Sequence, residues 1–595
     1  MAIDCIYFNG RFKGAPIFNK NITAVAIKDG KFVQLGTDAD VKKWADATTK
    51  LIDLKKRIVI PGLNDSHLHL IRGGLTFNME LRWDGVRSLS DALYLLKEQA
   101  KRTPPPQWVR VVGGWSEFQF KEKRMPTLDE INAAAQDTPV FILHLYDRAL
   151  LNKAALKAIG YDKNTQALPG TEIQRDTAGN PTGMLIAAPN AMILYSALSL
   201  GPRLNPADQT NSTLHFMREL NRLGITSLID AGGGFQHYPD DYAVIEALQQ
   251  NDQLTVRIAY NLFTQRPNHE LDDFQHWTTI SHYQQGNDYY RHNGAGEMLV
   301  FSAADFEDFL MPRPDLPSVM EQQLEPVVRL LAEKRWPFRL HATYDESIQR
   351  VLNVYEKINK DISFDQLHWF FDHAETISES SIERVKNLGG GIAIQNRMAF
   401  QGEYFINQYG KEKIRHSPPI TKILEAGIPV GMGTDGTRVS SYNPWLCLYW
   451  LTTGKSIGGT PLYGEDNILS REKALELYTH GSAWFSNEEK IKGLFAENYL
   501  ADFAVLSDDY FQVKDDDIKN IYSVMTVVGG KIVHACDEFA SYNPPLSPVS
   551  PDWSPIKAWG TYAQSTTIID QAHFSAFSHH DRHCRHSFEC LCWAI

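Results

Sequence analysis

One pattern recurs through the middle of the chain: an amphipathic helix, a glycine, and then a short apolar strand. In HFMRELNRLGITSLIDAG the helical periodicity ends just before Gly224, which supplies the C-terminal cap, and an apolar strand then runs to Asp230. The same order returns around Gly389 and Gly427. Helices that alternate with strands of about five residues are typical of parallel βα units.

The repetition of these units narrows the choice of fold. Several units across roughly 400 residues fit a closed (β/α)8 barrel or an open doubly wound sheet. The sequence has no G-x-G-x-x-G after a strand, which is the fingerprint of open sheets that bind dinucleotides. We therefore expect an α/β protein built on a (β/α)8 TIM barrel.

The two ends of the chain carry a different pattern. Residues 24–36 predict a β-hairpin with Asp29-Gly30 at its turn, and residues 523–535 predict another with two glycines at the turn. Hairpins at opposite ends predict one small β-sandwich domain assembled from both termini, with the barrel inserted between them. The predicted boundaries are 1–58 and 486–540 for this domain and 59–485 for the barrel.

Two further segments depart from the repeating units. Residues 76–215 contain few clear βα units, and we expect much of this stretch to be an insertion that caps the barrel. Residues 541–595 begin with a proline-rich linker and end in a tail rich in histidine and cysteine, 573–595. The tail could bind zinc or copper, or it could be disordered or disulfide-linked.

Length and charge exclude several classes of partner. A chain of 595 residues is too long for one ordinary core, and its net charge of −12 argues against nucleic acid as the main partner. The sequence has no apolar run of about 18 residues and no secretion signal at its start. We expect a cytoplasmic protein with a small-molecule substrate and no membrane partner, and leave a homo-oligomer open.

The first candidate functional residues are two histidines separated by one residue. His67 and His69 lie in PGLNDSHLHL, and alternation along a β-strand points residues i and i+2 to the same side. Both imidazoles could therefore face one ion. The alternative is a pair of hydrogen-bonded histidines in a buried strand.

Three more polar residues close later strands. His341 follows PFRL, His373 follows HWFFD, and Asp435 ends PVGMGTD. Each alone could be structural, for example an aspartate that caps the next helix. In a barrel, however, the strand ends converge on one face, and zinc and similar ions take imidazole and carboxylate ligands.

This arrangement resembles the amidohydrolase superfamily of metal-dependent hydrolases. Within it the chain is similar to amidohydrolase family 3, which includes N-substituted formamide deformylases. The resemblance covers roughly residues 1 to 540 and is carried by PGLNDSHLHL, RLHATYDES, DHAETI, GMGTDGTR and ADFAVL. It implies metal ligands on the first, fifth, sixth and eighth barrel strands. The matching residues are His67, His69, His341, His373 and Asp435.

The chain departs from its relatives at the fourth strand. Many relatives place a carboxylated lysine there to bridge two metals, whereas NGAGEMLVFS offers Glu297. We expect Glu297 to be a ligand that can bridge two ions. The alternative is that Glu297 forms an ion pair with a nearby basic side chain and that a single metal ion carries out the catalysis. The expected cofactor is thus a divalent metal, in the first instance zinc, with one or two ions.

Three residues are candidates for binding substrate. Arg148 replaces a histidine of relatives in YDRALLNKAAL, and it could meet a substrate carboxylate or form a surface salt bridge. Trp115 could line the substrate site or be a buried core residue. Gln395 ends GGIAIQ on the expected seventh strand, where it would face the mouth of the barrel.

The ligand set implies a reaction. A divalent ion activates water and polarises a carbonyl, and Asp435 is placed to act as general base. We expect hydrolysis of a C–N bond in an amide, formamide or cyclic amide. The alternatives are a deaminase or esterase of the same superfamily, or a non-catalytic relative that uses the barrel for binding. The retained histidines and Asp435 favour an enzyme.

Overall fold

The centre of the molecule is a parallel barrel. The computed structural model describes residues 2–169, 171–187, 191–233, 236–305, 309, 315–562, 564 and 568–570. Within these residues, one sheet contains eight parallel strands in sequence order around the barrel, so the predicted TIM barrel is confirmed and the open sheet is excluded. The strands are β7 (Leu63–Leu68), β13 (Ile225–Asp230), β14 (Arg257–Leu262), β15 (Tyr290–Ala295), β16 (Phe338–Ala342), β17 (Trp369–His373), β18 (Gly391–Gln395) and β19 (Val430–Gly433).

The barrel closes between its first and last strands. The backbone N–H of Asp435 donates to the carbonyl of His67 at 2.8 Å. The buried carboxylate of Asp65 on β7 accepts the N–H and the hydroxyl of Thr434, which follows β19, and the hydroxyl of Tyr478. Asp65 therefore ties together the two edges that a sheet would otherwise leave open.

Amphipathic helices cover the barrel. α11 illustrates the cause, because its buried residues Ile348, Val351, Leu352 and Tyr355 recur at helical spacing and face the strands. None of the helices in the described ranges has the length and apolar character that a membrane span requires. The helices around the barrel are α7 (Pro206–Arg222), α8 (Ala243–Gln250), α9 (Glu270–Ile280), α10 (Met320–Glu333), α11 (Asp345–Asn359), α12 (Glu379–Asn387), α13 (Arg397–Tyr409), α14 (Lys411–Ile414), α15 (Ile420–Glu425), α16 (Pro444–Thr453) and α17 (Arg471–Glu476).

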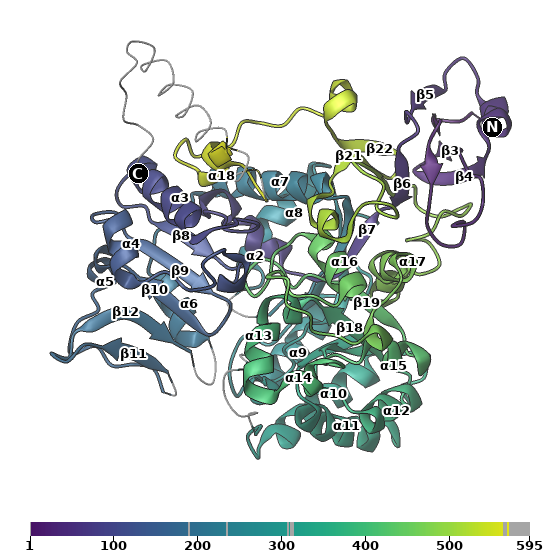
Figure 1. Cartoon of the computed structure of the whole chain (residues 1–595). Coiled ribbons are helices and arrows are strands. Elements are labelled where there is room, and N and C mark those ends of the chain that lie inside the picture. Colours follow the sequence, from purple (N-terminus) through teal and green to yellow (C-terminus); the bar gives the residue numbers. More distant parts are fainter. Residues whose placement is uncertain are drawn as a thin grey trace, which may run out of the picture.

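Strands from both ends of the chain meet in a β-sandwich (Figure 1). Both predicted hairpins are confirmed, as β3 pairs with β4 and β21 with β22. Tyr7, Phe32, Phe503 and Val527 belong to one apolar core between the two sheets. The first sheet is β4 (Lys31–Gly36), β3 (Ala24–Lys28), β1 (Cys5–Phe8) and β5 (Lys50–Asp53); the second is β2 (Arg11–Phe12), β6 (Ile58–Pro61), β20 (Phe503–Leu506), β21 (Ser523–Val528) and β22 (Lys531–Ala535).

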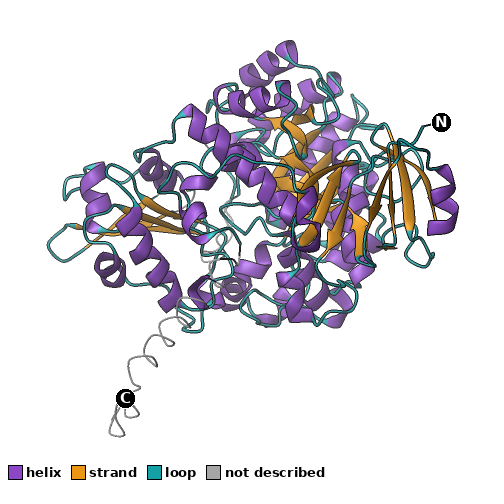
Figure 2. Ribbon diagram, turned by 90° about the horizontal axis from the view of Figure 1, so that it is seen from above, coloured by secondary structure: helices purple, strands orange, loops and turns teal. Residues whose placement is uncertain are grey.

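The range predicted as an insertion contains a sheet of its own. Figure 2 shows its strands apart from those of the barrel. Trp83, Trp115 and Val111 are in one core of this part, and Phe141 and Leu185 are in another. The sheet order is β11 (Glu172–Arg175), β12 (Pro181–Ile186), β10 (Arg148–Leu151), β9 (Val140–His144) and β8 (Val109–Val112), with helices α3 (Leu89–Arg102), α4 (Leu128–Ala134), α5 (Lys153–Ile159) and α6 (Met192–Ser199).

The proline-rich segment after residue 541 makes specific contacts with the barrel and the insertion. Its backbone carbonyls at Ser547 and Trp553 are bound by His215 of α7 and Gln99 of α3, each at 2.8 Å. Trp559 of α18 (Pro555–Trp559) then packs into the core of the insertion. Specific contacts thus fix the segment along the barrel and the insertion. The histidine- and cysteine-rich tail, 573–595, lies outside the described residues.

A buried ion pair joins the barrel to the β-sandwich and gives a test of this architecture. Arg257 of β14 contacts Asp502 through Nε to Oδ2 at 2.7 Å and Nη2 to Oδ1 at 3.0 Å. Both side chains are nearly inaccessible to solvent. We predict that Arg257→Ala lowers the free energy of unfolding by about 3–5 kcal/mol, because Asp502 is left charged and buried. The measurement is the shift in urea-denaturation midpoint.

The control for this prediction is a partly exposed pair. Arg384→Ala removes a comparable pair with Glu356, whose side chains are 25% and 41% exposed. Its loss should cost less than about 1 kcal/mol. Equal shifts for the two variants would contradict a structural role for the buried pair.

Candidate metal centre

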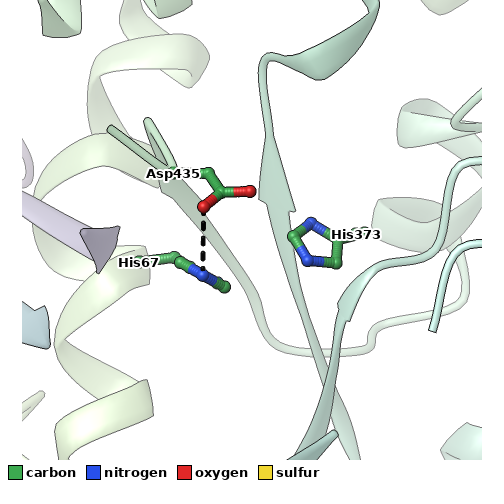
Figure 3. A group of neighbouring side chains, drawn as sticks. All are labelled: His67, His373 and Asp435. Atoms are coloured by element: carbon green, nitrogen blue, oxygen red, sulfur yellow. Dashed lines mark ion pairs between the residues drawn. The ribbon is translucent and has the colours of Figure 1, made fainter. Parts of the chain in front are cut away.

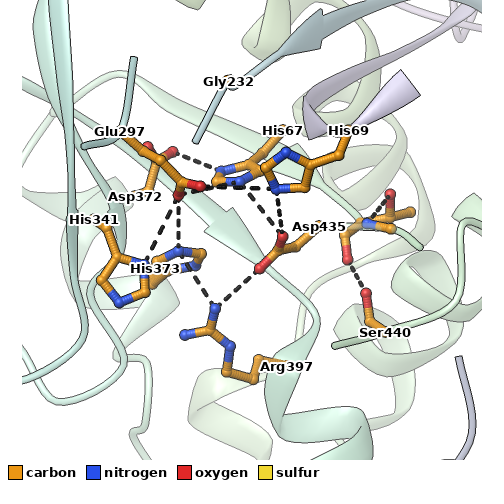
Figure 4. A network of polar contacts seen from close by, with 12 residues as sticks. His67, His69, Gly232, Glu297, His341, Asp372, His373, Arg397, Asp435 and Ser440 are labelled. Atoms are coloured by element: carbon orange, nitrogen blue, oxygen red, sulfur yellow. Dashed lines mark hydrogen bonds and ion pairs between the residues drawn. The ribbon is translucent and has the colours of Figure 1, made fainter. Parts of the chain in front are cut away.

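The fold brings together six polar side chains from the ends of five strands (Figure 4). His67 lies in β7 and His69 directly after it, because the strand gives way to the short helix α2 (Leu70–Gly74). Glu297 follows β15 by two residues. The remaining three come from later strands: His341 in β16, His373 at the end of β17, and Asp435 after β19.

Glu297 lies at the centre of the histidines. Its Oε2 is 3.4 Å from His67 Nε2, 3.7 Å from His373 Nε2 and 3.8 Å from His341 Nδ1. Its Oε1 is 3.7 Å from His69 Nε2. The side chain is 13% exposed, so solvent reaches the cluster on this side.

A glycine gives Glu297 the space it occupies. Gly233 has φ of +89°, and a Cβ at this position would lie 2.8 Å from Glu297 Oε1. A larger residue would therefore collide with the carboxylate and would also be strained in its backbone.

Asp435 uses its two oxygens differently. Oδ1 is 3.1 Å from His69 Nε2 and 3.5 Å from His67 Nε2, as Figure 3 shows for His67. Oδ2 accepts from Arg397 Nη2 at 2.9 Å. Burial raises the pKa of Asp435, but His67, His69 and Arg397 together bring it well below its usual range. The carboxylate is therefore ionised at neutral pH.

Contacts behind the cluster orient two of the imidazoles. His67 Nδ1 is 3.0 Å from Asp372 Oδ1, and Arg339 Nε donates to the other oxygen of Asp372 at 2.7 Å. His341 Nε2 lies 3.0 Å from the backbone carbonyl and 3.2 Å from Oδ1 of Asp305. Each ring thus turns its other nitrogen toward the cluster, which is the arrangement that carboxylates impose on metal-binding histidines.

The donor set fits a divalent ion. Three groups of three residues have ligand atoms within 4.8 Å of one another among the described residues. His67 Nε2 is buried and has no hydrogen-bond partner there, although it faces two carboxylates. Bonds of 2.0–2.2 Å in a tetrahedral zinc site place ligand atoms about 3.3 Å apart. The groups are His67, His373 and Asp435; His67, His69 and Glu297; and Glu297, His341 and His373.

The three substrate-binding candidates lie in different surroundings. Trp115 is fully buried in the insertion core, where its N–H donates to the carbonyl of Leu143. Arg148 is 29% exposed and paired with Asp147, which fits the salt-bridge alternative. Gln395 is 1% exposed at the end of β18, and its amide atoms have no hydrogen-bond partner among the described residues. Gln395 therefore keeps its amide available at the strand end.

Several functional contacts were missed by sequence reasoning. Asp372 stands directly before His373, and the Asp-His pair after an apolar strand was the only local signal. Arg339 and Arg397 contact partners on neighbouring strands that are distant in sequence, and no local pattern marks them. Arg397 begins α13 and contacts both Asp435 and His373, the latter at 3.4 Å.

A buried charge network joins the insertion to α13. His144 Nε2 is 2.9 Å from Glu117 Oε2, and Nδ1 is 2.7 Å from Asp147 Oδ1. The hydroxyl of Tyr404 on α13 donates to the other oxygen of Glu117. Burial lowers the pKa of His144, but the two carboxylates raise it to about 9. His144 is thus a buried cation between two anions.

Known proteins have sequences similar to this chain. A model of the amidohydrolase family matches residues 50–534. The chain is 26% identical over 530 residues to the YtcJ protein of Bacillus subtilis, with 86% of this chain and 96% of that protein covered. It is 22% identical over 552 residues to the N-substituted formamide deformylase of Arthrobacter pascens, with coverages of 89% and 97%.

Solved structures share the fold. An uncharacterised metal-dependent hydrolase from Pyrococcus horikoshii matches with a TM-score of 0.64 at 20% identity, and covers 86% of this chain and 99% of its own. A variant of the atrazine chlorohydrolase TrzN from Arthrobacter aurescens, in complex with zinc and atraton, matches with a TM-score of 0.51 at 15% identity. The coverages there are 91% and 97%.

The network around His144 predicts a dependence of stability on pH. A pKa raised from 6.5 to about 9 stabilises the fold below pH 6.5, and this contribution is lost as the pH rises through about 9. The shift corresponds to about 3 kcal/mol. We predict that His144→Gln lowers the melting midpoint strongly at about pH 6 and much less at about pH 9.5.

His269 provides the control for this measurement. It pairs with Asp272 on the surface, with 57% of its side chain exposed. His269→Gln should leave the midpoint unchanged at both pH values. A gap between wild type and His144→Gln that stays constant with pH would show that His144 is not charged in the folded protein.

Proposed function

The chain belongs to the amidohydrolase family, and from this premise we propose that it is a metal-dependent hydrolase of a carbon–nitrogen bond in a small amide, formamide or cyclic amide. The observation that carries the proposal is the cluster of four histidines, Glu297 and Asp435 at the carboxyl ends of the barrel strands. Function collects at this face in TIM barrels. The similarity to a protein named N-substituted formamide deformylase supports the bond type.

The proposed holders of the metal fall into two sets that share Glu297. His67, His69 and Asp435 form one side, and His341 and His373 form the other. The position of Glu297 within 3.8 Å of a nitrogen of every histidine supports a bridging role. When bound, a divalent ion such as zinc lowers the pKa of water from about 15.7 toward about 7 and polarises a carbonyl.

Asp435 is proposed to move the proton. Its Oδ1 faces the histidines, where the attacking water and the substrate carbonyl would meet, and it would accept the proton of that water. The same oxygen would then deliver the proton to the departing amine. Arg397 acts as a positioning residue, because its contact with Oδ2 holds the carboxylate in one orientation. The buried Gln395 is a proposed hydrogen-bonding partner for the substrate at the neighbouring strand end.

Substitution of Asp435 tests the proton transfer. We predict that Asp435→Asn keeps most of the bound metal and reduces turnover by at least about 10³-fold, because the amide cannot accept the proton. The assay uses metal-loaded protein with N-formyl and N-acyl amines and cyclic amides, beside esters and aminated heterocycles. Metal content is measured by mass spectrometry.

The prediction for Asp435→Asn has a control variant, and two results would contradict the proposed mechanism or reaction. Asp552→Asn changes an aspartate whose side chain is 97% exposed, and it should leave turnover unchanged. Unchanged turnover in Asp435→Asn would remove this residue from the mechanism. Turnover of esters or aminated heterocycles, with none of any amide, would replace the proposed reaction by one of its alternatives.

Metal stoichiometry tests the bridge. We predict that Glu297→Gln lowers the number of bound ions by about one per chain, because a neutral amide is a weaker ligand than a shared carboxylate. The tail is present in both proteins, so the difference reports on the barrel alone. Glu412→Gln, at an exposed position, should not change the count. Equal stoichiometry in Glu297→Gln and wild type would exclude Glu297 as a ligand.

A further inference from the structure

A cavity of about 360 Å³ lies beside the candidate metal centre and is rich in arginine. It is lined by α2, the barrel residues after Asp435, and parts of the insertion. None of the six candidate metal ligands lines it. Its arginines are Arg72, Arg110, Arg203 and Arg438, and its carboxylates are Glu80 and Asp241.

Arg438 is the most informative of these residues. It is only 7% exposed, and its Nε and Nη1 are buried without a hydrogen-bond partner among the described residues. Its guanidinium lies 4.7 Å from the ring centroid of Tyr195, which holds the plane in place. Burying a cation whose donors lack partners raises the free energy of the folded protein. A bound anion would offset this cost.

Arg110 presents a second buried cation to the same cavity. It is 5% exposed, its Nη2 donates to the carbonyl of Pro202, and its Nε has no hydrogen-bond partner in the described part of the chain. Burial lowers the pKa of Arg110, Glu80 raises it, and Arg438 and Arg203 lower it further, so that the pKa falls to about 10. The like charges are therefore close enough to act on one another.

The two carboxylates of the cavity are already engaged. Glu80 accepts from Arg82 Nη2 at 2.5 Å and from the hydroxyl of Thr76 at 2.7 Å. Asp241 accepts the backbone N–H of His237 at 2.7 Å. The four arginines that line the cavity outnumber its two carboxylates, which leaves an excess of positive charge.

Two segments that carry candidate metal ligands continue into the lining of the cavity. Arg72 follows His69 by three residues and Arg438 follows Asp435 by three, so each wall residue continues a ligand segment. The N–H of His69 donates to the carbonyl of Gly436 at 3.1 Å, which fixes the two segments side by side. A substrate that extends from the metal centre past these segments would place its far end among the arginines.

We propose that this cavity binds an oxyanion of the substrate, a carboxylate or a phosphate, with Arg438 and Arg110 as the principal donors. The inference rests on the proposed function and specifies its substrate class as amides that carry an anionic group near the scissile bond. Arg148, which the sequence suggested for this role, is already paired with Asp147. Apolar neighbours such as Met79, Val112 and Leu198 would accommodate the hydrocarbon part.

Matched substrates test the proposal. N-acetylleucine carries a carboxylate, N-(3-methylbutyl)acetamide lacks it, and N-acetyl-O-phosphoethanolamine carries a phosphate instead. We expect kcat/KM for at least one anionic compound to exceed that of the neutral one by about thirtyfold or more, since charge-assisted hydrogen bonds contribute on this scale. Arg438→Gln should remove most of that preference, chiefly through KM, and Arg438→Lys should retain part of it.

Anion binding measured without turnover tests this inference independently of the proposed function. Calorimetry with 4-methylpentanoate and with inorganic phosphate, on the metal-loaded full chain, should show binding that weakens by about thirtyfold in Arg438→Gln. Arg11→Gln removes one guanidinium that is 54% exposed on the β-sandwich, so it controls for net charge and should change nothing.

Each outcome is decisive. Hydrolysis of neutral amides with no anionic preference, or a preference unchanged in Arg438→Gln, would overturn the inference while the proposed function stands. Anion binding that depends on Arg438, with no hydrolysis of any amide, would overturn the proposed function and leave the anion site. Folding of the variant is checked by its melting midpoint and metal content, and Arg438→Lys serves if Arg438→Gln does not fold.

Discussion

The site depends on how the barrel is closed. The first and last strands meet through Asp65, whose buried carboxylate accepts donors from Thr434 and Tyr478 and also from the backbone of His67. This carboxylate sets the register between two segments that are far apart in the sequence. Because His67 and Asp435 lie on those segments, the same contact brings the imidazoles of one strand beside the carboxylate of the other.

The sequence predicted the parts of this site that local pattern controls. Strand alternation placed His67 and His69 on one side, and the apolar strands before His341, His373 and Asp435 marked their positions. The barrel and both hairpins followed from periodicity and turn residues. Glu297 has no such signal, and it was identified only because a resemblance supplied an expected position.

Local sequence patterns could not predict the contacts between segments that are distant in sequence. Asp372 and Arg339 support His67 from across the barrel, and Arg397 holds Asp435 from the helix after the seventh strand. For Arg148 the sequence left a substrate contact and a salt bridge open, and the pair with Asp147 fits the second. The proline-rich segment is a further example, because its hydrogen bonds to α3 and α7 cannot be predicted from its composition.

The composite β-sandwich has a consequence for how the chain is made. β6 pairs with β20, and Val59 meets Val505 only after about 440 further residues have been synthesised. At about 5–20 residues per second the ribosome needs about 20 to 90 s for this stretch. During that time the edge of β6 that pairs with β20 has no partner, although the other edge can pair with β2. An unpaired edge is a surface on which neighbouring nascent chains can associate. Closure of the intervening barrel, which brings its first and last strands together, shortens the search once β20 leaves the ribosome.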